Sequence, residues 1–153
     1  MEMHPYLNFR GDCEAAFTFY ERCFGGRLGP VFRYAGSPLA HQVPPDWQEK
    51  VMHMSLELGG QSLMGADVAP ERYEEPKGFS LSIQLSSTAD AERIFAELAG
   101  NGVVVAPLEQ TFWAARFGVV RDRFGITWLI NCDGAAADTV SRDVENTQSL
   151  EVS

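Results

Sequence analysis

Three polar residues that alternate along one short segment could carry acid–base chemistry. His53, Ser55 and Glu57 occupy every second position of the stretch VMHMSLEL, residues 51–58. Successive side chains of a β-strand point to opposite faces, so this spacing places the three on one face and the Met and Leu side chains, beginning at Met52, on the other. An imidazole beside a bound molecule can transfer a proton or contact the ligand. The same polar row is also typical of a solvated strand face, and the sequence leaves both interpretations open.

A second candidate is the aromatic and cationic segment QTFWAARF, residues 110–117. Trp113 and Arg116 precede a predicted strand in a loop-like stretch. A guanidinium fork suits carboxylate or phosphonate groups, and an indole plane suits a flat ring or a cation. We therefore expect Trp113 and Arg116 to contact a ligand. Trp128 follows the strand alternation instead and is expected in the core.

The predicted elements that position these residues form a repeated pattern. Two amphipathic helices, which Asp12 and Ser87 can cap, lie within residues 11–26 and 86–102. Each helix follows one predicted strand and precedes three others. The first set of strands covers residues 5–9, 27–34, 51–58 and 61–67, and the second covers 79–85, 103–110, 116–122 and 126–132. The chain therefore has the order β-α-β-β-β twice, which predicts an α+β fold built from an internal repeat.

Length and composition restrict the class of protein. With 153 residues, of which 45% are hydrophobic, the chain fits one domain with its own core. We expect this domain to span residues 1–133, with repeats at about 4–67 and 78–133, and an acidic, disordered tail at 134–153. The net charge of −9 argues against nucleic-acid binding, because phosphate groups would be repelled.

Apolar runs and cysteines indicate a cytoplasmic protein. No apolar run approaches the roughly 18 residues that span a bilayer, and the first residues lack the pattern of a secretory signal. The three cysteines form no CxxC pair, so neither a disulfide framework nor a zinc finger is expected. Cys13 and Cys23 are interpreted as packing residues, with a reactive thiol at Cys13 as the alternative.

Three segments resemble a known family. PYLNFRGDCEAAFTFY, KVMHMSLELGG and QTFWAARFGVVRDRFGITWLIN are similar to the vicinal-oxygen-chelate superfamily, which includes glyoxalase I, extradiol dioxygenases and bleomycin-resistance proteins. They are most similar to its PhnB-like branch, often labelled 3-demethylubiquinone methyltransferase. The resemblance covers residues 4–133. It implies two βαβββ modules that form a curved mixed sheet around a cleft, and a homodimer.

The resemblance also permits a test for metal binding. Enzymes of this superfamily hold a divalent ion with His and Glu side chains on the first and last strands of each module. The matching positions here are Pro5 or His4, then Met64, Ser80 and Leu129. Because a divalent ion needs at least three imidazole or carboxylate donors, we expect no metal and no other cofactor. Metal-dependent glyoxalase or dioxygenase activity is therefore not expected.

Two functional hypotheses remain. The first is a metal-free small-molecule-binding protein with an unknown ligand, which His53, Glu57, Met64, Trp113, Arg116 and Leu129 would contact. The second is an enzyme of unknown reaction in which His53 is the acid or base and Arg116 holds an anionic substrate. A methyltransferase is not expected, because the chain has no Gly-rich loop after a first strand. A dimeric scaffold without a ligand is the third reading of the sequence.

Overall fold

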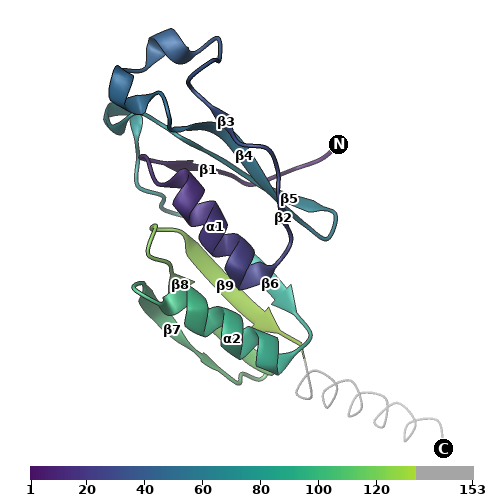
Figure 1. Ribbon diagram of the computed structural model, residues 1–153. Coiled ribbons are helices and arrows are strands. Elements are labelled where there is room, and N and C mark those ends of the chain that lie inside the picture. The colour runs from purple at the N-terminus through teal and green to yellow at the C-terminus, as the bar shows by residue number, and fades with distance from the viewer. Residues whose placement is uncertain (134–153) are drawn as a thin grey trace, which may run out of the picture. The chain divides into compact units, whose positions relative to one another are not determined.

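The chain forms two compact units, each with one helix and one sheet (Figure 1). The computed structural model describes residues 1–133, and the predicted acidic tail at 134–153 lies outside the described residues. The first unit ends at Glu75 and the second begins at Pro76, inside the connector between the two predicted repeats. That the two repeats form a single domain stays a prediction.

The first unit contains a five-stranded sheet and the helix α1, Cys13–Phe24. β1 runs parallel to β5, while β2, β3 and β5 all pair antiparallel with β4. The predicted strand at 27–34 is split into two short pieces on either side of Pro30, which has no N–H for the strand ladder. The strands are β1 (Tyr6–Phe9), β2 (Arg27–Leu28), β3 (Phe32–Arg33), β4 (Val51–Leu58) and β5 (Gln61–Asp67).

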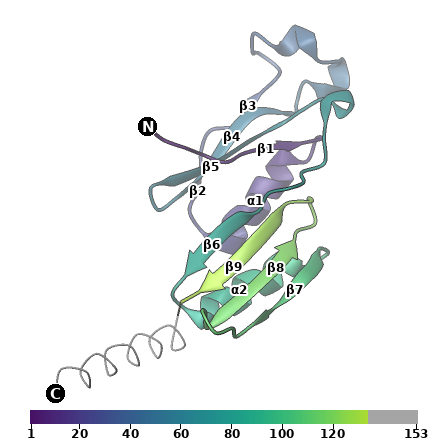
Figure 2. The same cartoon turned by 180° about the vertical axis from the view of Figure 1, so that it is seen from behind.

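The second unit repeats this plan with a four-stranded sheet and the helix α2, Thr88–Ala99 (Figure 2). The strand order is β6-β9-β8-β7, with β6 parallel to β9. The strands are β6 (Leu81–Leu85), β7 (Val103–Glu109), β8 (Arg116–Arg121) and β9 (Thr127–Cys132). The predicted order β-α-β-β-β is therefore confirmed for this unit, and the first unit differs only by its divided strand.

In each unit the helix covers one face of the sheet, and we call the opposite side the open face. The helix-side rows are buried: Leu7, Phe9, Met54 and Leu56 in the first unit and Val120, Trp128 and Ile130 in the second. The prediction that Trp128 lies in the core is confirmed, since only 2% of it is exposed. Its indole N–H donates to Asp122, whose carboxylate also accepts the backbone N–H groups of Phe124 and Ile126.

The predicted apolar row of β4 is wrong at its first residue. Val51 is buried, whereas Met52 and His53 are both partly exposed. Phe32 pairs with His53 and Arg33 pairs with Val51, so the register shifts by one residue at Met52. Such a bulge inserts one residue in one strand and reverses the direction of the side chains that precede it. Beyond the bulge, Met54 and Leu56 follow the predicted alternation.

The start of α1 depends on a carboxylate that the sequence analysis did not assign. The predicted cap, Asp12, makes no side-chain capping hydrogen bond. Instead, Asp67 at the end of β5 accepts the backbone N–H groups of Gly11 and Cys13 with Oδ1, each at 2.9 Å, and that of Val51 with Oδ2 at 3.0 Å. The Ser87 cap of α2 is confirmed, because its hydroxyl oxygen accepts the N–H of Asp90 at 3.2 Å.

An aromatic ring from the helix packs against a strand glycine in both units. A Cβ added to Gly65 would lie 2.7 Å from the Phe17 ring, and one added to Gly118 would lie 2.8 Å from the Phe95 ring. Both distances are far below an ordinary carbon–carbon contact, so the ring occupies the space that any other residue would need. These glycines set how closely each helix approaches its sheet.

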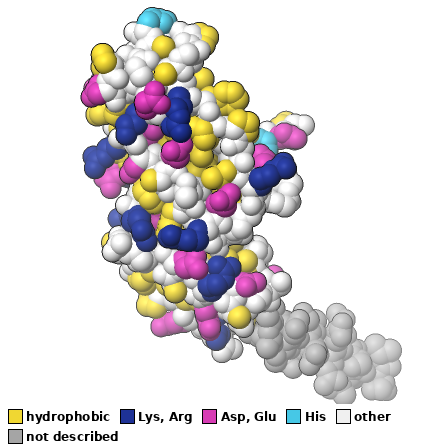
Figure 3. Space-filling model, viewed as in Figure 1, with side chains coloured by type: hydrophobic (Ala, Val, Ile, Leu, Met, Phe, Trp, Pro, Cys, Tyr) yellow, Lys and Arg dark blue, Asp and Glu magenta, His cyan; other side chains and the backbone are white. Residues whose placement is uncertain are grey.

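The surface carries mixed charge. Figure 3 shows basic and acidic side chains interspersed over the face in view. Within residues 1–133, no helix has the length and apolar character needed to span a membrane. The expected lack of nucleic-acid binding stays a prediction.

Candidate functional site

His53 lies on the open face of the first unit, beside Tyr6 and Phe32. The Tyr6 hydroxyl is 3.0 Å from His53 Nδ1, and the two rings stack with centroids 5.6 Å apart. Phe32 lies on β3, which pairs with β4, and its ring centroid is 6.3 Å from that of His53. Tyr6 and Phe32 are 48% and 51% exposed, which is unusual for two large rings in contact with the same imidazole. We call Tyr6, Phe32 and His53 the ring cluster.

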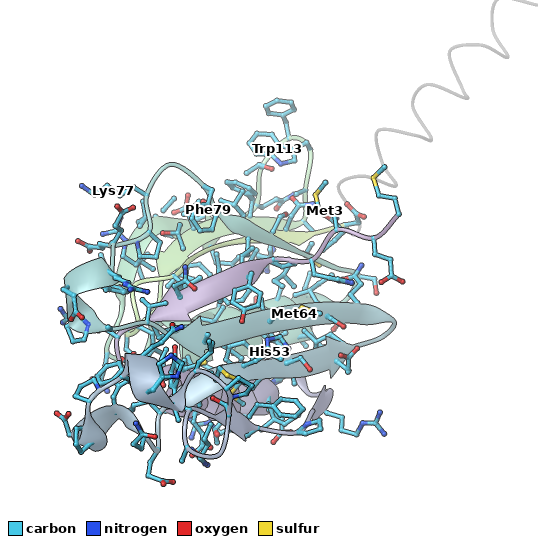
Figure 4. All side chains as sticks on the ribbon, turned by 90° about the horizontal axis from the view of Figure 1, so that it is seen from above. Met3, His53, Met64, Lys77, Phe79 and Trp113 are labelled. Carbon is cyan, nitrogen blue, oxygen red and sulfur yellow. The ribbon has the colours of Figure 1, made fainter. Side chains whose placement is uncertain are left out.

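Three different strands bring the ring cluster together. Tyr6 belongs to β1, Phe32 to β3 and His53 to β4, so β5 lies between the first and the last. Tyr6 pairs with Met64 of β5, and Met64 pairs with Ser55 of β4, which places these three in one cross-strand row. His53 lies two residues from Ser55 on the same face. This is the diagonal position that a long side chain from the neighbouring strand can reach. Figure 4 shows Met64 and His53 on neighbouring strands.

The Tyr6 hydroxyl keeps its proton over the whole physiological range. Partial burial raises the pKa of Tyr6 above its usual value, and the negative charges that Cys13 and Tyr34 would carry add to this effect. A neutral phenol is therefore the partner of the imidazole. This pairing supplies a second titrating group beside His53, which the linear sequence did not show.

Glu57 points to the same open face but contacts a different group. The hydroxyl of Ser62 donates to its carboxylate, with both oxygens at 2.7 Å, and Arg27 is its cross-strand partner on β2. Glu57 is four residues from His53 along β4, which is a separation of about 13 Å at the usual rise of a strand. His53 and Glu57 therefore share a face but are too far apart to contact the same small group of a ligand.

The open face of the second unit carries Leu129 in its middle. Leu129 on β9 pairs with Ser82 of β6 and Val119 of β8. In the next row, the Asn131 amide donates to the Gln84 side chain at 3.0 Å, while its own side-chain oxygen is buried without a partner among the described residues. This face is therefore part apolar and part amide-lined.

Trp113 stands at the end of this face on a tight turn. The turn is closed by the N–H of Thr111, which donates to the carbonyl of Ala114 at 3.0 Å. The Trp113 ring packs edge-on against Phe117 at 5.5 Å and against Phe112 at 4.7 Å. Trp113 is 48% exposed and lies on a loop outside the strands (Figure 4). Its ring is therefore available to a ligand or partner.

Arg116 lies on the other side of this sheet. It pairs with Cys132 on the helix-facing row, and its Nε and Nη2 donate to one oxygen of Glu92 on α2, both at 3.2 Å. Its Nη1 donates to the carbonyl of Ala115 at 2.7 Å. The guanidinium is thus engaged with the helix, on the side opposite to Leu129, and it does not converge with Trp113 on the open face.

The positions that the superfamily uses for metal ligands can now be placed by register. Leu7 and Phe9 face the helix, so His4 and not Pro5 shares the side of Tyr6 in an extended chain. His4 contacts Glu2 at 3.2 Å, and Met64 and Leu129 occupy the last-strand positions. Across residues 1–133, no three His, Cys, Asp or Glu side chains are grouped so that they could hold an ion. These residues do not fit a hard divalent metal.

The burial of the cysteines favours packing roles. All three thiols are buried. Burial, followed by the nearby Asp67 carboxylate, raises the pKa of the Cys13 thiol far above its ordinary value. A thiol that stays protonated is a poor nucleophile, which favours the interpretation of Cys13 as a packing residue.

The residues predicted to contact a ligand include His53, Glu57 and Met64 in one unit and Trp113 and Leu129 in the other, but the prediction did not include their ring neighbours. Tyr6 and Phe32 meet His53, and Phe117 meets Trp113. The available signal for Tyr6 was the alternation of the first strand, which places it on the face opposite to Leu7 and Phe9. The two groups of residues belong to different units. Their joint contact with one ligand therefore stays a prediction.

Known proteins are similar to this chain in sequence or in fold. Protein YjdN of Escherichia coli (strain K12) is 31% identical over 139 residues, which cover 86% of this chain and 95% of that protein. The crystal structure of protein PA1353 from Pseudomonas aeruginosa is 43% identical with a TM-score of 0.80, covering 88% of this chain and 98% of the other. The PhnB protein from Bacillus cereus shares the fold at a TM-score of 0.74 and 23% identity, covering 86% and 99%.

A family comparison agrees with these relatives and with the two βαβββ units. The model of the Glyoxalase/Bleomycin resistance protein/Dioxygenase superfamily matches residues 3–130. The resemblance found in the sequence is thereby confirmed, and the chain belongs to this superfamily.

Proposed function

We propose that this chain is a small-molecule-binding protein that holds its ligand without a metal ion. The observation that carries the proposal is the ring cluster, which exposes Tyr6 and Phe32 around an imidazole on the open face of the first unit. Large rings that stay half exposed on a sheet face are typical of surfaces that stack against another molecule. Met64 extends this surface along the same cross-strand row.

The donor chemistry supports the metal-free part of the proposal. On the open face of the first unit, the imidazole of His53 and the carboxylate of Glu57 are separated by about 13 Å along the strand, too far to share one ion. Met64 and Leu129 occupy positions where the superfamily uses hard donors, and a thioether or an alkyl chain is a poor substitute for Zn²⁺, Mg²⁺ or Mn²⁺. Binding would therefore use stacking, apolar contact and hydrogen bonds.

In the second unit, Trp113 and Leu129 are the proposed contacts. Trp113 is the one exposed tryptophan of the three, because Trp47 and Trp128 are 8% and 2% exposed. Its share of the tryptophan fluorescence should respond most to a ligand at this unit, whereas the nitrogen-15 signals of His53 report a ligand at the first. Arg116 is left out of the proposed surface because Glu92 and α2 already engage it.

The proposal is tested by titrating the full chain with a panel of aromatic amides, acids and amines while following both signals. We expect His53→Ala to weaken binding, and His41→Ala, an exposed histidine in the 3-10 turn Ala40–Gln42, to leave it unchanged. The idea fails if no panel member perturbs either signal, or if stoichiometric metal is found coordinated to the chain. Native mass spectrometry of the purified protein adds a search for a ligand already bound.

An enzyme is the second candidate, because the structure pairs Tyr6 with His53 at 3.0 Å. A phenol and an imidazole in hydrogen-bond contact can pass a proton to or from a bound molecule. The anchoring role predicted for Arg116 has no support in this arrangement. If a bound ligand is consumed, and His53→Ala abolishes its turnover while retaining its binding, this candidate replaces simple binding. Homodimerisation is expected in either case and is checked by light scattering after size exclusion.

A further inference from the structure

One ring nitrogen of the ring cluster has no hydrogen-bond partner among the described residues. His53 Nδ1 is occupied by the Tyr6 hydroxyl at 3.0 Å, and His53 makes ring contacts with Tyr6 and Phe32. Among residues 1–133, His53 Nε2 has no hydrogen-bond partner. Nε2 is not one of the buried unpaired side-chain atoms of residues 1–133, so a ligand can reach it from solvent. With Nδ1 occupied by Tyr6, Nε2 is the nitrogen through which the imidazole would bind a ligand.

The Tyr6 hydroxyl determines which nitrogen carries the proton. Burial raises the pKa of Tyr6, so the phenol stays neutral and retains its O–H. An imidazole nitrogen is a better acceptor than a phenol oxygen, and the O–H therefore donates to Nδ1. In a neutral imidazole only one nitrogen carries hydrogen, so a Tyr6 O–H donated to Nδ1 leaves the hydrogen on Nε2.

The charged groups near His53 do not provide an anion site. Glu57 lies farther along the same strand, and Arg27 faces Glu57 from β2. Arg33 of β3 is paired with Glu14 of α1 at 2.6 Å and also donates to the carbonyl of Glu49. The neighbouring residue of β5 is the uncharged Met64. The cation of this face, Arg27, lies in the Glu57 row, about 13 Å along the strand from His53, so a carboxylate at His53 would have no cation beside it, whereas a neutral acceptor would meet only the N–H and the rings.

We propose that His53, fixed as its Nε2–H tautomer by Tyr6, donates a hydrogen bond to the carbonyl oxygen of an uncharged, flat conjugated ligand that stacks on the Tyr6 and Phe32 rings. This inference rests on the proposed function and names the ligand class for the first unit. Aromatic amides, quinones and conjugated ketones have the required flat ring and neutral acceptor. The ring faces supply stacking and the N–H fixes orientation.

The tautomer is tested first, without a ligand. Nitrogen-15 spectra of the full chain distinguish an imidazole protonated at Nε2 from one protonated at Nδ1. We expect the Nε2–H pattern for His53 at neutral to alkaline pH, and a shift towards a tautomer mixture in Tyr6→Phe, which keeps the ring but removes the hydroxyl. A His53 protonated at Nδ1 in the unaltered chain would overturn the inference, whatever ligands bind.

The ligand class is tested with three probes of the same shape: 2-naphthamide, 2-naphthoate and 2-naphthylmethylammonium. We expect the neutral amide to bind most tightly and to move the His53 Nε2 signal. His53→Phe keeps a ring but removes the N–H, and should weaken the amide roughly three- to tenfold, the effect of one neutral hydrogen bond. His41→Phe is the matched control and should change nothing.

The outcomes separate this inference from the proposed function. If none of the probes or panel ligands binds the unaltered chain, the proposed function fails. If the amide binds but His53→Phe retains full affinity, or if the ammonium or carboxylate probe binds as tightly as the amide, the ligand class is wrong while binding itself stands.

Discussion

The buried carboxylate of Asp67 should be one of the most sensitive positions for stability. It accepts three backbone N–H groups, from Gly11 and Cys13 at the start of α1 and from Val51 at the start of β4. Only 1% of Asp67 is exposed, so water cannot replace these bonds. We predict that Asp67→Asn, which changes one oxygen to an NH₂ group, destabilises the fold by about 2–4 kcal/mol.

The magnitude follows from the three bonds. Asparagine can keep its oxygen towards Gly11 and Cys13, but these become neutral bonds and each loses part of the roughly 1.5–3 kcal/mol typical of a charged acceptor. Its NH₂ group then faces the N–H of Val51, which leaves a buried donor unpaired at about 1–3 kcal/mol. The smaller desolvation cost of a neutral amide offsets some of this sum, which places the total near 3 kcal/mol.

Urea unfolding followed by circular dichroism measures the effect, with Asp12→Asn as the matched control. Asp12 is exposed and makes no capping bond, so its substitution should cost less than about 1 kcal/mol. Amide hydrogen exchange gives a local readout, because the N–H groups of Cys13 and Val51 should exchange faster in Asp67→Asn. Equal unfolding free energies for the two variants would refute this account of the helix start.

Three further predictions use other contacts. Gly118→Ala should destabilise the chain by about 1–3 kcal/mol in urea unfolding, because the new methyl group would overlap the Phe95 ring. An effect below roughly 0.5 kcal/mol would contradict that packing. Above about pH 8.5 an unfolded thiol ionises while Cys13, with its raised pKa, stays protonated, so stability present at lower pH should fall by about 1.4 kcal/mol per pH unit. Cys13→Ala should remove its own share of that slope, while the Cys132 thiol, whose pKa burial also raises, keeps its share. Parallel stability curves for the two proteins would contradict the assignment to Cys13. Arg116→Ala should leave naphthamide affinity within about twofold and cost less than about 1 kcal/mol, because its ion pair with Glu92 is exposed; a larger loss of affinity would place Arg116 in the ligand surface.

The sequence predicted the elements well because local signals determine them. Ser87 and Asp90 have the spacing of a helix cap, and the hydrogen bond between them is present. Asp122 and Gly125 have the residue types and spacing of the two ends of a type I turn, and the Gly125 N–H donates to the Asp122 carbonyl at 3.0 Å. In both cases the partners are close in sequence, so residue type and spacing were sufficient.

Contacts between distant residues were not predictable in the same way. Asp67 caps a helix that begins 54 residues earlier, and Asp12, a normal capping residue in the right place, makes no such bond. The Tyr6–His53 pair spans 47 residues and depends on the order of strands β1, β5 and β4. The predicted strand at 116–122 does begin at Arg116, but the side chain was expected to face a ligand, whereas strand alternation directs it to the helix side.

The two repeats have similar residues on the helix side of their sheets and different residues on the open side. On the helix side, Leu7 and Phe9 of β1 have apolar counterparts in Ile83 and Leu85 of β6, and a ring packs on a glycine in each unit. On the open side, the row through Met64 contains Tyr6, whereas the row through Leu129 contains Ser82.

Packing explains the first pattern, because a core tolerates few changes in volume. The open faces are not under that constraint, so their difference reflects what each face contacts. If the ring cluster is the specific part of the ligand surface, the nitrogen-15 and amide shifts caused by 2-naphthamide should concentrate on β1, β3 and β4, and Tyr6→Ala should reduce affinity more than Ser82→Ala. Equal effects of the two substitutions would mean that the ring cluster has no special part in recognition.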